Sequence, residues 1–281
     1  MPKRWTLAAL AAAAAVGCWF LVRQAPAIAA AGVLHPFRRV TRLSAPDHCR
    51  DVMFDGAGIR LKGWRCAPPA PTRGAVVYLQ GIADNRASAF AAIQRLVPRG
   101  FEVIAYDGRA QGESEGRYCT YGFYEKRDLA KVLDTLQTRP VALIGTSLGA
   151  AIALQTAAED QRVAAVAAAE AFSDLWSIAR HRAPRLLSDS MIRRTLQLAG
   201  QKARFNVDEV SPLAAASRIR IPVLLLHGEL DRDTPPEHSR QVFAALGGAK
   251  KLIIVPGAKH DGALNAQTWP LVEKWLDEAL K

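Results

Sequence analysis

Short and almost uninterrupted hydrophobic runs recur along most of the chain. They occupy residues 75–81, 101–107, 141–147, 163–171, 222–228 and 251–257. A strand that is covered on both faces needs this continuous hydrophobicity, whereas a half-exposed strand alternates apolar and polar side chains. Stretches with helical spacing separate the runs, which is typical of parallel strands joined by helical crossovers. The pattern therefore predicts an α/β fold with a mostly parallel central sheet flanked by helices.

Apolar residues at helical spacing mark the segments between the runs. The clearest are 87–100, 122–137, 235–248 and the amphipathic last stretch, 265–281. Two of these stretches end at Gly100 and Gly248, and glycine commonly terminates a helix. We expect each of the four stretches to form a helix against the sheet.

The interval from about 172 to 216 breaks this alternation, because it keeps helical spacing without any strand-like run. An insertion of this length is predicted to form a helical lid above the sheet. The lid and the rest of residues 45–281 are assigned to one domain, since a chain with 50% hydrophobic residues can bury a single large core.

The segment 49–66 predicts a β-hairpin ahead of the first run, because two alternating stretches flank a glycine-rich turn. Cys49 and Cys66 lie nearly symmetrically about that turn, so they could face each other across the two strands. A disulfide between them would suit an oxidising compartment and favour export. Two free buried thiols are the alternative, and the sequence leaves both open.

Residues 1–31 differ in composition from the rest of the chain. Lys3 and Arg4 precede an uncharged run at 5–22, and small residues fill 25–31. A basic start, an apolar segment and small-residue triplets predict a signal peptide, but the run is also just long enough for a transmembrane anchor. Both alternatives predict a membrane-anchored or exported protein, with the periplasmic or extracytoplasmic side favoured.

Charge narrows the expected partners. The formal net charge is +11, from 37 Lys and Arg against 26 Asp and Glu. The basic residues form no long run and are not interleaved with aromatic residues, so we expect no nucleic-acid partner. A solvated basic surface or attraction to an anionic membrane would account for the charge. Nothing in the sequence indicates an oligomeric state.

The segment Gly145-Thr-Ser-Leu-Gly149 joins a strand-like run to a helical pattern. A serine at such a turn adopts a strained backbone conformation, and its neighbours two positions away must be small for the chain to pass. Ser147 would project above the sheet at the N-terminus of the following helix. The pattern predicts Ser147 as a nucleophile and the Leu148 N–H as one donor to an oxyanion.

A serine hydroxyl needs a base, and the base needs an orienting carboxylate. Asp231 and His260 each follow a strand-like run downstream of Ser147. Because the carboxyl ends of parallel strands share one rim of a sheet, the three side chains could meet there. Asp233 competes with Asp231 for the role of the carboxylate.

Other candidate ligands and bases are assigned no catalysis. His227 is expected to support its loop, His181 and His238 to lie at the surface, and Asp261 to face away from the base. The chain has no H-E-x-x-H sequence and no close Cys and His cluster, and no glycine-rich phosphate motif follows the first run. We therefore expect neither a metal nor a cofactor.

From about residue 50 to 281 the chain resembles the α/β-hydrolases, which place nucleophile, acid and histidine in this order. The matching segments are HGELDRDTP at 227–235, GAKHDG at 257–262 and YDGRAQGESEG at 106–116. The resemblance implies Asp231 rather than Asp233 as the acid. It also implies a structural role for the third segment, in which Ala110 replaces the usual glycine.

The stretch YLQGIADN at 78–85 gains a role from the same resemblance. In the family the second oxyanion donor comes from the loop after this strand, which makes the Ile82 N–H its counterpart. Gly81 would let the chain turn sharply. Gln80 stands where the family often has histidine, and we expect its amide to fix the loop because it both donates and accepts.

These features predict a serine hydrolase, a carboxylesterase or lipid esterase, that cleaves a small-molecule or lipid ester through a covalent acyl-enzyme. The resemblance also permits a serine peptidase or a thioesterase on the same triad, because a fold does not select a substrate. A non-catalytic binding protein on the hydrolase fold is a further alternative. The basic residues of the lid interval either favour anionic substrates and lipids or form a solvated face: Arg180, His181, Arg182, Arg185, Arg193 and Arg194.

Overall fold

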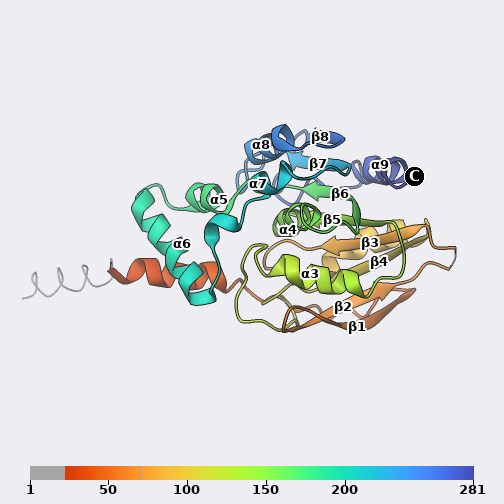
Figure 1. Cartoon of the computed structure of the whole chain (residues 1–281), viewed down its shortest axis with the longest axis horizontal. Helices are drawn as coiled ribbons and strands as arrows, with labels where there is room; N and C mark the ends of the chain where they lie inside the picture. Colours follow the sequence, from red (N-terminus) through yellow and green to blue (C-terminus); the bar gives the residue numbers. More distant parts are fainter. Residues whose placement is uncertain (1–22, 70) are drawn as a thin grey trace, which may run out of the picture.

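The computed structural model describes residues 23–69 and 71–281. Within them, eight strands form one sheet in the order β1-β2-β4-β3-β5-β6-β7-β8 (Figure 1). The strands are β1 (Cys49–Asp55), β2 (Arg60–Cys66), β3 (Gly74–Leu79), β4 (Phe101–Tyr106), β5 (Val141–Thr146), β6 (Val163–Ala169), β7 (Val223–Gly228) and β8 (Lys250–Val255). β1 and β2 pair antiparallel, as do β2 and β4, and the remaining pairs are parallel. The predicted α/β fold is confirmed, and the six hydrophobic runs correspond to β3 through β8.

Helices cover both faces of the sheet. They are α2 (Phe90–Leu96), α3 (Glu125–Asp134), α4 (Leu148–Ala157), α5 (Leu175–Arg182), α6 (Asp189–Ala203), α7 (Pro212–Ala216), α8 (Glu237–Ala245) and α9 (Trp269–Ala279), with short 3₁₀ turns η1 (Arg86–Ala89) and η2 (Val207–Glu209). The side chains of α2 and α9 belong to the core on one face, and those of α3, α4 and α8 to the core on the other. The four helices predicted from apolar spacing are α2, α3, α8 and α9.

The central strands are buried on both sides, which explains their continuous hydrophobicity. In β3, Val77 and Leu79 pack into the core under α3 and α4, whereas Val76 and Tyr78 pack into the core under α2. This alternation follows from the two-residue period of a strand. Helix α4 is also buried along almost its whole length, from Leu148 to Thr156. The junction between β5 and α4 therefore lies in the most enclosed part of the fold.

The predicted hairpin forms the edge of the sheet. Cys49 lies opposite Cys66 in the register of β1 and β2, and a disulfide joins the two residues. Cys119 is a buried free thiol. Of the two alternatives that the sequence left open for Cys49 and Cys66, the structure contains the disulfide.

The interval 172–216 contains α5, α6, η2 and α7, as its helical spacing predicted. Asp174 caps α5 by accepting from the Ser177 N–H, and Ser188 caps α6 by accepting from the Met191 N–H. Helices α5 and α6 extend past the end of the sheet (Figure 1). That position suits the predicted lid. Its function as a lid stays a prediction.

Residues 23–34 form a helix beside α6 (Figure 1). Ala30 and Leu34 of this helix are buried in the same core as α3 and α4. The uncharged run 5–22 lies outside the described residues, so its function as a signal peptide or anchor stays a prediction. Among the residues that are described, no helix combines the length and the apolarity needed to cross a membrane.

Candidate active site

Ser147 occupies a strained turn between β5 and α4, with φ 49° and ψ −111°. Its N–H donates to the carbonyl of Ala169 at 2.8 Å. A Cβ at Gly145 would overlap the backbone of Gly149, and a Cβ at Gly149 would overlap the backbone of Leu79. The two glycines therefore let α4 begin immediately against the sheet, which is the reason the sequence pattern requires them.

His260 lies between the other two residues of the predicted triad. Its Nδ1 is 2.7 Å from Oδ2 of Asp231, and its Nε2 is 3.1 Å from Oγ of Ser147. We place the imidazole proton on Nδ1, because the carboxylate can only accept. The lone pair on Nε2 then faces the serine hydroxyl, which is the arrangement required of a general base. The loops after β5, β7 and β8 thus bring Ser147, Asp231 and His260 together.

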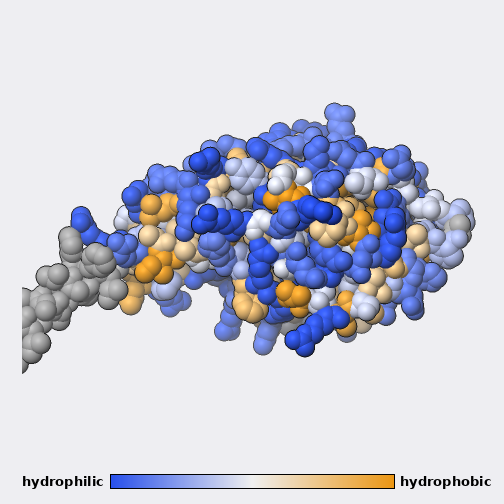
Figure 2. Space-filling view, turned by 90° about the horizontal axis from the view of Figure 1, so that it is seen from below, coloured by the Kyte–Doolittle hydropathy of each residue, from blue (hydrophilic) through white to orange (hydrophobic). Residues whose placement is uncertain are grey.

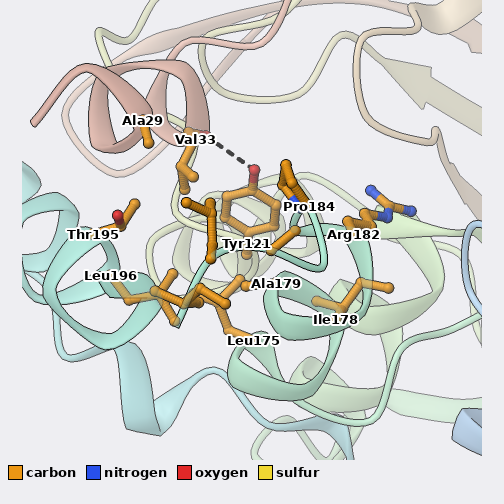
Figure 3. Close-up of a pocket in the computed structure, with 13 residues that line it drawn as sticks. Ala29, Val33, Tyr121, Leu175, Ile178, Ala179, Arg182, Pro184, Thr195 and Leu196 are labelled. Atoms are coloured by element: carbon orange, nitrogen blue, oxygen red, sulfur yellow. Dashed lines mark hydrogen bonds between the residues drawn. The ribbon is translucent and has the colours of Figure 1, made fainter. Parts of the chain in front are cut away.

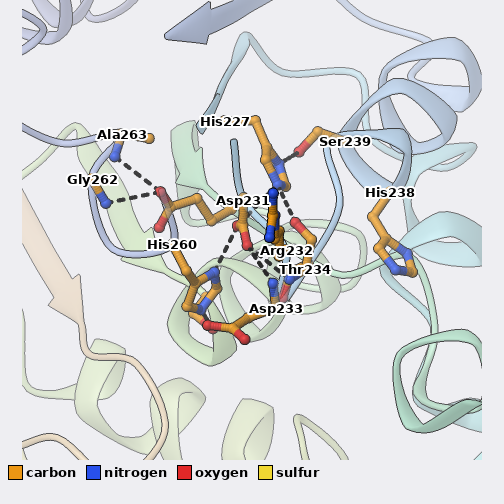
Figure 4. Close-up of polar contacts among 12 residues, drawn as sticks. His227, Asp231, Arg232, Asp233, Thr234, His238, Ser239, His260, Gly262 and Ala263 are labelled. Atoms are coloured by element: carbon orange, nitrogen blue, oxygen red, sulfur yellow. Dashed lines mark hydrogen bonds and ion pairs between the residues drawn. The ribbon is translucent and has the colours of Figure 1, made fainter. Parts of the chain in front are cut away.

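The loop after β7 holds Asp231 as a buried anion (Figure 4). Its Oδ1 accepts from the backbone N–H groups of Asp233 at 2.9 Å and Thr234 at 2.8 Å. Burial disfavours the charge, but hydrogen bonding to His227, His260 and the Thr234 N–H outweighs burial and holds the pKa of Asp231 well below its usual range. Asp233 contributes its backbone to this loop, and its side chain does not replace Asp231.

His227 supports the same loop, as predicted, and is fully buried. Its Nε2 is 2.6 Å from the carbonyl of Thr234 and 3.3 Å from Oδ2 of Asp231. Its Nδ1 accepts from the hydroxyl of Ser239 at 2.6 Å. The imidazole thus links the loop after β7 to helix α8 (Figure 4).

The prediction that His238 lies at the surface is wrong. Its side chain is 8% exposed, and Nδ1 lies 3.2 Å from the backbone nitrogen of Ser173 and 2.9 Å from its hydroxyl. Burial lowers the pKa of His238. The helical pattern of α8 could not show that this face turns toward the loop after β6. His181 is exposed, as expected, and its Nε2 contacts the carbonyl of Arg232.

Asp261 does not face away from the base, contrary to the prediction. Its Oδ1 lies 3.9 Å from Nε2 of His260, and its side chain lines the same pocket as Ser147. Asp261 has a left-handed backbone conformation with φ 63°. Consecutive side chains of an extended segment point in opposite directions, but a left-handed residue changes this direction. The side chain of Asp261 is therefore not forced to point away from that of His260.

Several charges act on His260. Burial lowers the pKa of the imidazole, but the hydrogen bond to Asp231 and the negative charges of Asp231, Asp261 and Glu170 outweigh burial, so the pKa is raised above its usual value. The site therefore stabilises the imidazolium that forms when Ser147 loses its proton.

Glu170 is a residue of the site that the sequence analysis overlooked. It follows β6, is 1% exposed, and accepts from the backbone N–H groups of Asp261 at 2.8 Å, Gly262 at 3.1 Å and Ala263 at 2.9 Å. Burial raises the pKa of Glu170. These bonds hold the segment directly after His260. The only signal in the sequence was a single carboxylate inside the apolar run 163–171.

The two predicted oxyanion donors come from different segments that both lie beside Ser147. Leu148 follows it as the first residue of α4, and Ile82 lines the pocket that contains the serine. A Cβ built on Gly81 would lie 3.7 Å from Cβ of Ser147, so the loop after β3 passes directly beside the nucleophile. Within residues 23–69 and 71–281, neither the Ile82 nor the Leu148 N–H donates to a protein acceptor.

Glutamine side chains fix the loop after β3. Nε2 of Gln80 donates to the carbonyl of Asp84 at 2.7 Å, so the amide contacts the loop through its donor. Its buried Oε1 has no hydrogen-bond partner among the described residues, so the expected accepted bond is missing. Oε1 of Gln111 accepts from the N–H of Ala83 at 2.7 Å. Ala83 has a positive φ of 58°, so the turn is tight. The N–H of Ala83 is thereby bonded within the protein, whereas Ile82, which precedes it, lines the pocket of Ser147.

The segment 106–116 has the structural role that the resemblance implied. Asp107 is fully buried and accepts from the backbone and guanidinium of Arg86 and from the Glu113 N–H. Ala110 adopts φ 60°, which explains why glycine is usual at this position. No atom of this network lies in the pocket around Ser147.

A polar pocket of about 360 Å³ surrounds the nucleophile. Ser147, Ile82, His260, Asp84, Asp233 and Asp261 line it, together with Arg39 and Arg182. Of the basic residues in the lid interval, only Arg182 reaches it. Arg180 pairs with Asp189 at 2.7 Å, and Arg193 stacks on Trp176, so these two cations are engaged within the lid interval.

Among the described residues, Glu170, His260 and Asp261 form one group whose ligand atoms lie within 4.8 Å of one another. Both oxygens of Glu170 already accept backbone N–H groups, and both nitrogens of His260 face Asp231 and Ser147. The ligand atoms of Glu170 and His260 are therefore already engaged by protein groups, and we assign no metal to this group of residues.

Comparison with known proteins places the chain in a family. The model described as the alpha/beta hydrolase family matches residues 76–269. The uncharacterized protein YqkD of Bacillus subtilis is 28% identical over 232 residues, which cover 74% of this chain and 72% of that protein. The 2,6-dihydropseudooxynicotine hydrolase of Paenarthrobacter nicotinovorans is 28% identical over 67% of this chain and 52% of that protein.

Solved structures agree on the architecture. The esterase Pf2001 of Pyrococcus furiosus superposes with a TM-score of 0.72 at 20% identity, over 88% of this chain and all of that chain. At this level of identity the likeness shows the fold alone, including the mostly parallel sheet with flanking helices.

Proposed function

This chain belongs to the alpha/beta hydrolase family, and from that premise we propose that it is a serine hydrolase that cleaves ester bonds. Ser147 is the nucleophile, His260 the general base and Asp231 the orienting carboxylate. The observation that carries the proposal is the continuous contact from Asp231 Oδ2 through the imidazole to Ser147 Oγ, at 2.7 and 3.1 Å.

The reaction follows from these contacts. Ser147 Oγ attacks the ester carbonyl carbon while Nε2 of His260 takes the hydroxyl proton, and the Ile82 and Leu148 N–H groups stabilise the resulting oxyanion. His260 then gives the proton to the departing alkoxide, which leaves an acyl-enzyme on Ser147. Water then loses a proton to the same nitrogen and attacks the acyl carbon. The bond from that carbon to Ser147 Oγ breaks, the acid leaves, and His260 returns the proton to Oγ. Asp231 keeps the imidazole oriented and stabilises its cation throughout.

An ester suits the site better than an amide for two reasons. An alcohol leaves with less help from an acid catalyst than an amine does. The pocket of Ser147 also adjoins an apolar cavity, since Arg182 lines both. A thioester or peptide would use the same residues, so a substrate panel must accompany the test of the triad.

Labelling with a fluorophosphonate probe tests the proposal. Wild-type protein and Ser217→Ala, which removes an exposed serine, are expected to label, whereas Ser147→Ala is not. Ser147→Ala should also lower ester turnover by a factor on the order of 10⁴ to 10⁶. Absence of Ser147-dependent labelling would favour a non-catalytic binding protein. Faster turnover of an amide or thioester than of the ester with the same acyl group would redirect the substrate class.

A further inference from the structure

A second cavity, lined mainly by apolar side chains, lies between the N-terminal helix and the lid interval (Figure 3). Its volume is about 250 Å³. Ala29 and Val33 of helix 23–34 form one wall, and residues of α5 and α6, among them Ala179 and Leu196, form the opposite wall. The ring of Tyr121 stands between the two walls (Figure 3).

Specific contacts hold the N-terminal wall in place. The Tyr121 hydroxyl donates to the carbonyl of Val33 at 2.9 Å, and Ala30 and Leu34 are buried in the core. The hydroxyl is thus bonded to a backbone carbonyl of the N-terminal wall, and Tyr121 lines the cavity. Helix 23–34 also lies before the segment that the family model matches, residues 76–269. The N-terminal wall is therefore formed by residues that precede the segment matched by the family model.

Arg182 connects this cavity to the catalytic pocket, because its side chain lines both. Its Nε donates to the carbonyl of Asp233 at 3.1 Å, and its Nη2 to Oγ1 of Thr234 at 3.1 Å. Both acceptors belong to the loop that holds Asp231. The guanidinium is thus tied to the catalytic loop, while the apolar stem of the side chain borders the cavity.

The surface near the cavity is also apolar. Ile28, the neighbour of Ala29, is 65% exposed, and Leu186, the neighbour of the lining residue Leu187, is 99% exposed. Figure 2 shows hydrophobic surface on the part of the molecule that helix 23–34 and α6 form. Water would leave such surfaces readily in favour of a hydrocarbon chain.

We propose that this cavity binds the apolar acyl chain of the ester, with the carbonyl at Ser147 and the chain passing Arg182. The inference rests on the proposed hydrolase activity and specifies its substrate class as esters of medium-length fatty acids. We take about 30 Å³ for each methylene, which is the volume that one water molecule occupies in the liquid. A cavity of about 250 Å³ then holds about eight carbons. Each methylene buried should then raise kcat/KM roughly fourfold.

The test is the chain-length profile of a series of p-nitrophenyl esters from acetate to dodecanoate. Wild-type kcat/KM is expected to rise with chain length through octanoate and to level off once the chain fills the cavity. Ala29→Trp places an indole in the cavity, so the ratio of octanoate to acetate turnover should fall about tenfold or more. Ala27→Trp is the matched control: it lies on the same helix, is exposed and does not line the cavity, so the ratio should not change.

A second variant and a binding measurement keep the two proposals separable. Ala179→Leu fills the cavity from α5 and leaves helix 23–34 unchanged. It should also lower the ratio of octanoate to acetate turnover, which would show that Ala29→Trp acts by filling space. Calorimetry on Ser147→Ala protein should show methyl octanoate binding that Ala29→Trp weakens and Ala27→Trp does not.

Hydrolysis that depends on Ser147 but has a flat chain-length profile in wild type would overturn the cavity assignment alone. Binding of methyl octanoate without hydrolysis of any ester would support the cavity and overturn the hydrolase, and absence of that binding would overturn the cavity.

Discussion

The carboxylate of Asp261 lies 3.9 Å from Nε2 of His260, the nitrogen that also contacts Ser147. Burial lowers the pKa of His260, but its hydrogen bond to Asp231 and the surrounding negative charges, including that of Asp261, raise the pKa above its usual value. A general base acts in its neutral form, so kcat/KM should fall as the pH drops through this raised pKa.

Asp261→Asn should move the acid limb of the kcat/KM profile to lower pH. The substitution removes a negative charge beside the imidazolium, which makes the cation less stable and lowers the pKa of His260. The measurement is ester turnover across the acid limb at constant ionic strength. Asp55→Asn, an exposed aspartate on β1, is the control and should leave the profile in place. An acid limb that stays fixed or moves to higher pH would contradict the role given to Asp261.

Asp231→Asn should lower kcat by about 10⁴, because the amide oxygen would stay with the Asp233 and Thr234 N–H groups and the amide NH₂ would face Nδ1, which favours the wrong tautomer of His260. Asp233→Asn keeps the backbone N–H that supports Asp231, so its kcat should stay within about tenfold of wild type. Steady-state kinetics on both variants decide between the two carboxylates. A larger loss in Asp233→Asn than in Asp231→Asn would show that the acid is misassigned.

Glu170→Gln should lower the free energy of unfolding by about 1–3 kcal/mol, because an amide NH₂ group would face one of the backbone N–H donors after His260. We also expect kcat to fall as His260 loses its fixed position. Urea unfolding with kinetics under native conditions measures both effects. Glu229→Gln is a matched control, since it is exposed and accepts from the Gly257 N–H in the same connection. Equal effects of the two substitutions would argue against a special role for Glu170.

Gln80→Ala should lower kcat roughly fivefold, since loss of one hydrogen bond to the loop costs about 1 kcal/mol and loosens the Ile82 donor. KM should change less, because the oxyanion exists only after attack. Gln94→Ala, at an exposed position of α2, is the control. Unchanged kcat in Gln80→Ala would mean that the contact with Asp84 does not position the loop.

Reduction of the bond between Cys49 and Cys66 should lower the free energy of unfolding by about 3 kcal/mol, as expected for a closed loop of this length. Denaturant unfolding with and without reductant measures the change. Ester turnover should survive in native conditions, because the hairpin forms the opposite edge of the sheet from β7 and β8. Free-thiol titration gives an independent check: the same thiol count before and after reduction would show that the bond is absent.

Local pattern was enough for much of the fold. Strands β3 to β7 are mostly apolar and buried because the sheet is covered on both faces, so each one is visible in its own segment. β8, at the edge of the sheet, begins with two exposed lysines before its apolar residues. The turn at Ser147 is visible in its own segment too, because Gly145 and Gly149 flank the serine. Gly145 is required by the nearby backbone of Gly149, and Gly149 by the backbone of Leu79 in the adjacent strand. The order of the strand-like runs also placed Asp231 and His260 on one rim with the serine.

The remaining features depend on segments that are far apart in the chain. Glu170 reaches the residues after His260, helix α8 turns His238 toward Ser173, and helix 23–34 meets α5 and α6 around a cavity. The sequence alone determined the central sheet, its flanking helices and the positions of Ser147, Asp231 and His260 along the chain, because burial and turn geometry constrain each segment separately. Which side chains surround those three residues was decided only by the packing of distant elements, whose approach leaves no periodic signal in the sequence.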